Sequence, residues 1–416
     1  MLYERWRQIS SERRNDVALR DGASGRRWTF GQLFCAGQSH PAREEEVAFP
    51  QGHSPQFILD LLAAWRDGKT VCPLEPRQAP PQFSNPPRKC VHLKCTSATT
   101  GAARLAAFTG GQLAADAENI VRTMGLRADW PNLGVISLAH SYGFSNLVLP
   151  LLLHGIPLIL APAPLPEMVR RATENERAVT LPSVPAMWRA WGESKAIPAN
   201  VRLAISAGAP LPLRLEAEIF ESLGLKIHNF YGASECGGIA FDAEARPRGD
   251  GSCVGAALSN VNLSVNEDGC LIVRSGAVAE TYWPEEADSP TGGVFHTSDL
   301  AELKEGLVYL RGRRDDQINV AGRKVSPETI ERACLANPGV RECLVFGAPS
   351  REEERSEIIV AVVAGEATEG ELRQYLLQTL PAWQVPRQWR FVKTLPASAR
   401  GKLSRQEWRR RFAAGA

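Results

Sequence analysis

Short apolar runs alternate with amphipathic stretches up to about residue 250, and this alternation limits the folds open to the chain. Runs of strand length occupy residues 70–74, 91–95, 133–139, 156–160, 178–182 and 202–208. Residues 57–65, FILDLLAAW, have the spacing of an amphipathic helix instead. Strands that alternate with helices predict an α/β architecture with largely parallel sheets.

From about residue 253 the pattern changes. Two stretches predict β-hairpins, with turns at residues 267–269 and 304–306. A smaller section follows the charged sequence GRRDDQ, with helices expected at residues 326–337 and 369–380 and strands at residues 342–349 and 357–365. We therefore expect an α/β protein in two parts: a large N-terminal domain of mixed α/β sheets, residues 1–312, and a small α+β C-terminal domain, residues 313–416. GRRDDQ is the candidate hinge.

Composition excludes several classes of protein. The 416 residues carry a formal net charge of only +2, which gives no field that would attract nucleic acid or a membrane surface. The nine Cys are scattered and none forms C-x-x-C, so a zinc site or a disulfide framework is not expected. The first residues, MLYERWRQISSERR, lack the apolar core of a secretion signal, and we expect a cytoplasmic protein.

One uncharged apolar run, residues 147–165, is long enough to cross a bilayer. Pro150, Gly155 and Pro157 interrupt it. The spacing predicts a helix, a stop at Gly155 and a short buried strand from Ile156 to Leu160. We expect no membrane span.

The sequence TSATTGAAR, residues 96–104, follows a predicted strand and holds four hydroxyl side chains, a Gly and an Arg. Such a loop offers hydroxyls and backbone N–H groups to phosphate oxygens, and Arg104 adds positive charge. A solvated polar turn has the same composition, so the loop alone leaves both interpretations open. It is not a Walker loop, because G-x-x-x-x-G-K-[ST] is absent.

Further motifs carry residues suited to a nucleotide. Tyr231, before a Gly, presents a ring to a planar base, and Glu235 offers a carboxylate to Mg²⁺, a hard cation. The small-residue turn SAGAPL, residues 206–211, lets backbone approach a flat ligand. Asp299, expected at the start of a strand, offers a carboxylate to two ribose hydroxyls. Singly, each of these residues is also explained by packing, capping or solvation.

The order and spacing of seven segments resemble one superfamily over nearly the whole chain. The segments are TSATTGAAR, LAHSYGF, SAGAPL, YGASE, TSDL, GRRDDQINVAGRKVSPETIE and LPASARGKLSR. They resemble the acyl-adenylate-forming enzymes, which include acyl- and aryl-CoA synthetases, adenylation domains of nonribosomal peptide synthetases and firefly luciferase. The resemblance implies two steps: a carboxylate attacks the α-phosphate of ATP to give acyl-AMP and pyrophosphate, and a thiol then attacks the acyl-AMP.

The resemblance also implies residue roles. The residues that would hold the phosphates are Thr96, Ser97, Thr99, Thr100, Gly101 and Arg104. Those that would enclose adenine are Tyr231, Gly232, Gly208, Ala209 and Pro210. Ser234 would touch the α-phosphate, Glu235 would ligate Mg²⁺, and Asp299 with Arg313 would bind the ribose. Lys402 would bridge carboxylate and α-phosphate in the adenylation transition state; Asp315 would be the hinge, and Gly322 and Lys324 would line the thiol tunnel.

The acid and the thiol are less constrained. The residues expected to line the acyl pocket are His140, Tyr142, Gly143, Phe144, Phe230 and Gly237. Their aromatic members suit an aryl or acyl acid, although each is equally compatible with core packing. Gly143 stands where amino-acid-activating members carry an Asp, which disfavours an α-amino acid. The thiol is CoA or the phosphopantetheine arm of a carrier protein; Asn319 before AGRK resembles short-acyl CoA synthetases and favours CoA.

Three positions depart from the family pattern. Ala98 stands for Gly, Ala103 for Pro and Arg104 for Lys in the phosphate loop, and the large domain is short beyond residues 77–88, a Pro-rich stretch. A non-catalytic relative that binds nucleotide or acyl groups, and an unrelated α/β NTPase that would release ADP, therefore stand beside the ligase hypothesis.

Overall fold

The computed structural model describes residues 1–41, 45–81, 86–87, 89–96, 104–284, 288–350, 357–395 and 405–413. Its main sheet has the strand order β14-β15-β17-β18-β13-β12-β11-β10-β9-β7-β8-β1-β2, and the edge strand β2 (Arg27–Thr29) pairs antiparallel with β1. Six neighbours pair in parallel: β11 (Ile227–Ala233), β10 (Val201–Ser206), β9 (Val179–Ser183), β7 (Asn132–Gly134), β8 (Leu158–Leu160) and β1 (Val17–Asp21). The predicted α/β architecture with parallel pairing is confirmed.

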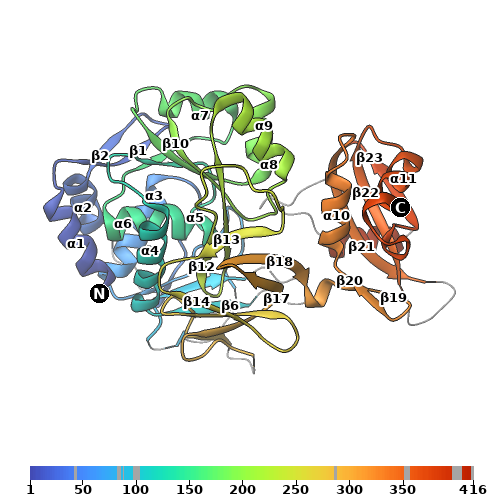
Figure 1. The fold of residues 1–416 in the computed structure, drawn as a ribbon. Coiled ribbons are helices and arrows are strands. Elements are labelled where there is room, and N and C mark those ends of the chain that lie inside the picture. Colours follow the sequence, from blue (N-terminus) through green and yellow to red (C-terminus); the bar gives the residue numbers. More distant parts are fainter. Residues whose placement is uncertain are drawn as a thin grey trace.

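Helices cover both faces of the parallel strands (Figure 1). On one face pack α1 (Leu2–Glu12), α2 (Phe30–Ser39), α3 (Pro55–Arg66), α4 (Gly110–Met124) and α6 (Leu149–His154). On the other lie α7 (Pro166–Thr173), α8 (Pro185–Glu193) and α9 (Leu213–Leu223). A single large cluster of buried side chains, with Trp6, Phe57 and Trp188 among its largest members, joins these helices to the sheet.

The apolar run at residues 147–165 folds as predicted. Helix α6 ends at Gly155, whose φ of 68° places it in the left-handed region, and β8 follows. Across the described part of the chain, no helix combines the length and the apolar character that crossing a membrane requires. By contrast, the strand expected at residues 133–139 ends at Gly134, because the chain then turns into the short helix α5 (Ser141–Gly143).

The second half of the main sheet is antiparallel. Strands β14 (Val261–Val265) and β15 (Cys270–Ser275) form one predicted hairpin, and β17 (Val294–Lys304) and β18 (Leu307–Arg313) form the other. β12 (Gly237–Phe241) and β13 (Cys253–Ala257) connect them to β11. The expectation that Asp299 starts a strand is wrong: it lies inside β17, beside a register shift between Leu300 and Ala301.

A second sheet has the order β16-β6-β5-β4-β3. Its strands are β3 (Val47–Ala48), β4 (Thr70–Val71), β5 (His92–Cys95), β6 (Leu105–Phe108) and β16 (Thr281–Trp283). β5 and β6 are antiparallel, and the candidate phosphate loop connects them. Its two ends are held together, because the Thr96 N–H and hydroxyl both donate to the Arg104 carbonyl, at 2.8 and 3.1 Å.

The remaining elements form a smaller unit, orange and red in Figure 1, with hydrophobic clusters of its own. Its strands are β19 (Ile318–Val320), β20 (Arg323–Val325), β21 (Val340–Pro349), β22 (Glu357–Gly365) and β23 (Gln388–Val392). Its helices are α10 (Pro327–Leu335), α11 (Glu369–Thr379) and α12 (Arg405–Ala413). The 3₁₀ turn Arg314–Asp316 connects β18 to β19; the division of the chain at residue 313 stays a prediction.

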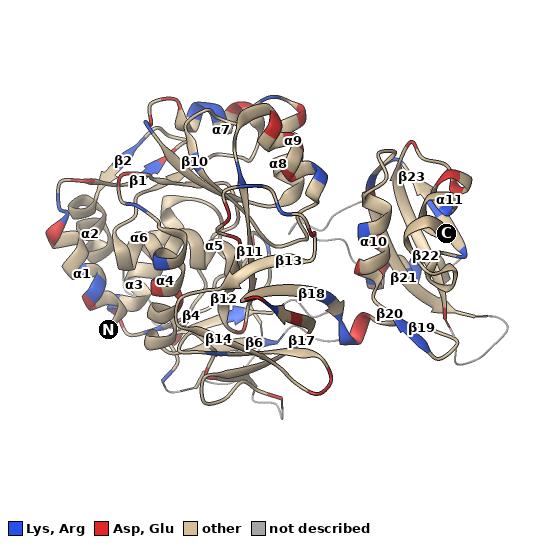
Figure 2. Ribbon diagram, viewed as in Figure 1, with Lys and Arg blue, Asp and Glu red and all other residues tan. Residues whose placement is uncertain are grey.

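Arg405 joins three segments of this small unit. Its guanidinium lies 2.8 Å from Glu328 and 2.8 Å from Glu331, both on α10, and 3.1 Å from Asp316 in the connecting turn. Positions of Lys and Arg alternate with positions of Asp and Glu along the ribbon of both units (Figure 2).

Candidate active site

A cavity of about 380 Å³ lies at the carboxyl ends of β10 and β11, where ligands bind in open α/β sheets. Helix α10 of the small unit borders it through Glu328 and Arg332. The sequence-predicted site residues that line it are His140, Tyr142, Gly208, Ala209, Pro210, Phe230, Tyr231, Gly232, Ser234, Glu235, Gly237, Asp299 and Arg313. Residues separated by up to 173 positions in sequence, His140 to Arg313, therefore meet in one site.

Tyr231, Asp299 and Arg313 form one end of the cavity. The Tyr231 hydroxyl donates to Asp299 Oδ2 at 2.5 Å, and Arg313 Nε lies 3.2 Å from Asp299 Oδ1. Burial and then the charge of Asp299 raise the pKa of Tyr231 well above its ordinary value, so the phenol stays a donor. The register shift beside Asp299 is the kind of irregularity that redirects a strand side chain toward a site. The carboxylate is thus held in place with acceptor capacity left for hydroxyl groups.

The tight turn between β11 and β12 carries Ser234 and Glu235. It depends on close backbone approach, because a Cβ on Gly232 would lie 2.6 Å from the Gly237 carbonyl oxygen. Gly208, at the opposite wall, has a φ of 83°, which favours glycine. These glycines bring main chain to the cavity surface on both sides, as a flat ligand requires.

Glu235 is a half-buried carboxylate at the cavity wall. Tyr282 donates a hydrogen bond to its Oε1 at 3.2 Å, and burial is the main cause that raises the pKa of Glu235. Within the described ranges, no group of three or more His, Cys, Asp or Glu is arranged to hold a metal alone. A Mg²⁺ ion at Glu235 would thus take its other ligands from phosphate oxygens and water, which is the usual pattern for this ion. Burial disfavours the charged form of the Glu235 carboxylate, and a bound cation would stabilise that form.

The described ends of the candidate phosphate loop reach the same region. Arg104 stacks on Tyr282, with its Cζ 4.9 Å from the ring centre, and its Nη1 lies 2.8 Å from Asp288. Tyr282 therefore connects Arg104 to Glu235. Ser97, Thr99, Thr100 and Gly101 lie outside the described residues, as does Lys402, and their roles stay predictions.

The acyl side of the cavity is formed by α5 and the following π-helix (Phe144–Val148). Ser141 Oγ lies 3.2 Å from Ser234 Oγ, so this segment begins against the nucleotide-side turn. Tyr142 and Phe230 line the cavity with ring centres 5.9 Å apart, as expected for aromatic walls. His140 Nδ1 accepts from the Tyr142 N–H at 3.3 Å while the residue also borders the cavity, so both interpretations of this histidine hold in part.

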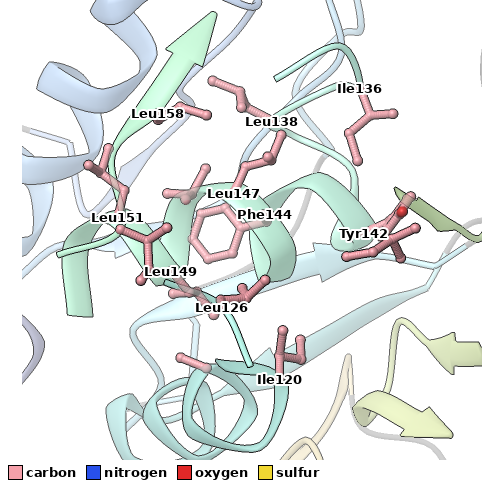
Figure 3. Close-up of a cluster of buried hydrophobic side chains, with 14 of the residues drawn as sticks. Ile120, Leu126, Ile136, Leu138, Tyr142, Phe144, Leu147, Leu149, Leu151 and Leu158 are labelled. Carbon is pink, nitrogen blue, oxygen red and sulfur yellow. The ribbon is translucent and has the colours of Figure 1, made fainter. Parts of the chain in front are cut away.

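Two expected pocket residues do not line the cavity. Phe144 is fully buried among leucines and isoleucines (Figure 3). Its ring centre lies 4.2 Å from that of His92, with the two ring planes tilted by 34°, and it does not line the cavity. The expectation that it forms the acyl wall is wrong, because on this short helix Tyr142 faces the cavity and Phe144 faces the core. Gly143 lies against backbone: a Cβ there would lie 2.0 Å from the Ser137 carbonyl oxygen.

Three predicted residues of the small unit lie within the described part of the chain, and none of them lines the cavity. Asp315 lies exposed in the turn Arg314–Asp316, with a carboxylate oxygen 3.7 Å from Arg314. Gly322 and Lys324 lie exposed on the β19–β20 hairpin and do not line the cavity. The hinge and thiol-tunnel roles remain predictions.

Several residues of the site were not identified from sequence. Besides Tyr282, Glu328 and Arg332, the acyl side contains Ser145 and Asn146, with Lys94 and Asp116 behind them. Two signals were present: a single lysine within the apolar strand VHLKC, and serines four residues apart at positions 141 and 145, the spacing of one helical face.

Comparison with known proteins gives the same picture. A model of the AMP-binding enzyme family matches residues 81–283, and a model of the AMP-binding enzyme C-terminal domain matches residues 329–402. A feruloyl-CoA synthase of Amycolatopsis sp is 29% identical over 343 residues, covering 77% of this chain and 69% of its own. A 2-succinylbenzoate–CoA ligase of Bacillus cytotoxicus is 27% identical over 392 residues, covering 84% and 80%.

Solved structures share the fold. ATP-bound MatB from Rhodopseudomonas palustris superposes with a TM-score of 0.85 at 19% identity, covering 99% of each chain. The o-succinylbenzoate CoA synthetase MenE of Bacillus subtilis, in complex with its acyl-adenylate intermediate, gives 0.83 at 20% identity, covering 97% of each chain.

A cavity at the strand ends of a large α/β unit, bordered by a small α+β unit, is the arrangement expected of an adenylate-forming enzyme. The two family models together match 277 residues, 203 in the first range and 74 in the second. The chain belongs to the AMP-binding enzyme superfamily, among its AMP-forming acid–CoA ligases.

Proposed function

We propose that this enzyme uses ATP to convert an aryl or acyl carboxylic acid to acyl-AMP, with release of pyrophosphate, and then transfers the acyl group to the thiol of CoA. The observation that carries the proposal is the convergence of Tyr231, Asp299, Ser234 and Glu235 on one cavity that continues into an acyl side. The curated relatives support the acid class, since both carry names of ligases for aromatic acids.

Each residue role follows from the chemistry of its side chain. Asp299 accepts the ribose hydroxyls, Tyr231 packs against adenine opposite Gly208, and Ser234 donates to the α-phosphate. Glu235, together with the phosphate oxygens, would hold Mg²⁺, which would supply positive charge near the leaving pyrophosphate. The first step crowds the carboxylate against a triphosphate, so it depends on fixed donors and cations more than on a base. Lys402 supplies the cation that bridges the two anions.

CoA is the preferred acceptor for two reasons. Asn319-Val320-Ala321-Gly322-Arg323-Lys324 resembles the corresponding segment of short-acyl CoA synthetases, and the curated relatives are named as CoA ligases. A carrier-protein phosphopantetheine arm presents the same thiol and is the second candidate, since Arg323 and Lys324 would suit either acceptor.

Acid-dependent exchange of labelled pyrophosphate into ATP, over a broad panel of carboxylic acids, tests the first step. Mass analysis of the products with CoA, and separately with a carrier protein that bears a free phosphopantetheine thiol, tests the second. We expect exchange with at least one acid, and AMP and an acyl-CoA as products. Release of ADP would indicate an unrelated NTPase mechanism, and silence across the whole panel would indicate a non-catalytic binding protein.

A further inference from the structure

The far end of the acyl side is polar, although its walls are aromatic. Ser145 and Asn146 line the cavity from the π-helix Phe144–Val148, and both side chains are almost completely buried. Ser145 is four residues beyond Ser141, which touches Ser234 at the reaction end. Because Ser145 follows Ser141 by about one helical turn, roughly 5.4 Å of rise, we take the Ser145 end of the cavity to be the end remote from Ser234.

The hydroxyl proton of Ser145 is already committed. It points to Asp116 Oδ2, at 2.6 Å, a distance typical of a charge-assisted hydrogen bond. Lys94 Nζ donates to the same hydroxyl oxygen at 3.3 Å. A serine hydroxyl has one donor and two acceptor lone pairs. One lone pair of the Ser145 hydroxyl oxygen therefore remains to accept a hydrogen bond from a ligand.

A buried ion pair keeps this orientation fixed. Lys94 Nζ lies 3.7 Å from Asp116 Oδ2, and the two side chains are 3% and 2% exposed. Asp116 Oδ1 accepts the Gly238 N–H at 3.0 Å, and Lys94 Nζ lies 4.6 Å from the centre of the Phe108 ring. Because Asp116 Oδ2 accepts the Ser145 proton, turning that proton toward the cavity would remove a charge-assisted hydrogen bond from a buried carboxylate.

Asn146 adds a second acceptor. Its Nδ2 donates to the Tyr142 carbonyl at 3.2 Å, which fixes the orientation of the amide. Its Oδ1 is buried and has no hydrogen-bond partner among the described residues. A buried acceptor without a partner costs free energy until a donor reaches it. Ser145 Oγ and Asn146 Oδ1 thus each leave an acceptor for a ligand. Of these two side chains, only the Asn146 amide keeps a donor, the N–H that does not bond the Tyr142 carbonyl.

We propose that the acyl end of the cavity selects carboxylic acids that carry a hydrogen-bond donor, a hydroxyl or an amino group, at the end remote from the carboxylate. The proposal rests on the proposed function, because it assigns the substrate class of the same site. Ser145 and Asn146 are the specificity-determining residues, and Lys94 and Asp116 position the Ser145 proton. An acid with an ether oxygen, a carbonyl or a bare C–H at that place would leave both acceptors unpaired.

The test compares acids that differ at one substituent. Benzoate, 4-methoxybenzoate, 4-hydroxybenzoate and 4-aminobenzoate, and the same four substituents on cinnamate, are assayed by pyrophosphate exchange with the unchanged enzyme. We expect kcat/KM for the hydroxyl or amino member of a series to exceed that of the unsubstituted and methoxy members by roughly 10- to 100-fold. A flat series, or a preference for the methoxy member, would overturn the proposal. Absence of exchange with every acid in a wider panel would instead overturn the proposed function.

Variants locate the preference. Ser145→Ala should reduce the ratio of hydroxyl to unsubstituted acid by roughly tenfold, while KM for ATP stays unchanged. Ser222→Ala, which removes a surface hydroxyl bonded to the Glu218 carbonyl, is the matched control and should leave the ratio unchanged. A ratio unaffected by Ser145→Ala would overturn the assignment of this residue.

A double variant tests whether the orientation of the Ser145 hydroxyl, and not only its presence, determines the preference for hydroxyl acids. Lys94→Met combined with Asp116→Asn removes the ion pair as a neutral whole and lets the position-116 amide donate to Ser145, which frees the hydroxyl proton. We expect the methoxy acids to gain relative to the hydroxyl acids in this double variant. An unchanged ratio would contradict the positioning role of the pair. Should the double variant not fold, the substrate series on the unchanged enzyme still decides the proposal.

Discussion

The two ends of the cavity are built in different ways. At the nucleotide end, Tyr231, Ser234, Glu235, Asp299 and Arg313 come from short sequence motifs, and neighbouring strands bring them together. At the acyl end, the polar groups are single residues from β5, α4 and the π-helix, whose sequence neighbours belong to the core. A part of the site that binds an invariant ligand can be recognised by motif, whereas the part that chooses the acid depends on isolated contacts between distant segments.

This difference predicts that substitutions at the two ends have different kinetic effects. Changes at the nucleotide end should alter ATP kinetics by the same factor for every acid, and changes at the acyl end should alter the order of the acids. The predictions below test the two ends by kinetics, by stability and by pH dependence, from the largest expected effect to the smallest.

The largest effect is expected for Lys402→Ala. Loss of the bridging ammonium should reduce pyrophosphate exchange by roughly 10²- to 10³-fold with every acid, because two anions then approach without a cation between them. Thiolysis of supplied acyl-AMP by CoA should persist. Lys393→Ala, an exposed lysine in the same unit, is the control. Equal loss of both half-reactions would contradict the role of Lys402.

At the ribose, Asp299→Ala should raise KM for ATP by roughly 10- to 100-fold, since hydrogen bonds to a charged group are lost and Tyr231 and Arg313 lose their partner. Tyr231→Phe keeps the ring and removes only the 2.5 Å hydrogen bond, so its effect should be smaller. Glu302→Ala, an exposed acid on the same strand paired with Arg311, is the control. A change in the order of preferred acids in Asp299→Ala would contradict the proposal that the nucleotide end does not influence the choice of acid.

Gly143→Ala tests the backbone of the acyl end. The added Cβ would lie 2.0 Å from the Ser137 carbonyl oxygen, so we expect a loss of roughly 1–3 kcal/mol in the free energy of unfolding. Urea unfolding measures it. Gly111→Ala is the matched control, because there the nearest atom is the Thr109 hydroxyl oxygen at 3.8 Å. Equal stability of the two variants would show that this approach is not a constraint.

The smallest effect is a shift in pH dependence. Burial raises the pKa of Glu235 above its ordinary value of 4.5, while the Tyr282 hydroxyl lowers it. Since Mg²⁺ needs the carboxylate, activity should fall as pH decreases through that raised pKa. Tyr282→Phe removes the donor, so the acidic limb of kcat/KM for ATP should move to higher pH, by up to about one unit. Tyr309→Phe, on β18, is the control; a shift toward lower pH would contradict this account.

The same pKa has a consequence for stability. The folded state binds the Glu235 proton more tightly than the unfolded chain does. The free protein therefore loses stability as pH rises from 4.5 through the raised pKa, and Mg²⁺ with nucleotide should restore it with release of protons. Thermal unfolding against pH, with and without Mg-ATP, measures both parts.

Sequence reasoning predicted the fold class because helical and strand periodicities are local. It also assigned Tyr231 to adenine and Asp299 with Arg313 to the ribose of one nucleotide. The hydrogen bond between Tyr231 and Asp299, and the register shift beside Asp299, were not predicted, because no local pattern marks them. It failed at Phe144, because aromatic character does not say which side of a short helix faces a cavity. The Lys94–Asp116 pair could not be assigned either, since its partners are 22 residues apart in sequence and meet only through tertiary packing.

Arg405 limits where the two units can pivot. Its guanidinium ties the terminal helix to α10 and to Asp316 through three carboxylates. These segments travel as one rigid body for as long as the clamp is intact, since opening it would leave several charges unpaired. Any swing of the small unit must then be absorbed by backbone torsions on the N-terminal side of Asp316, in a stretch that begins after β18 and is only two residues long.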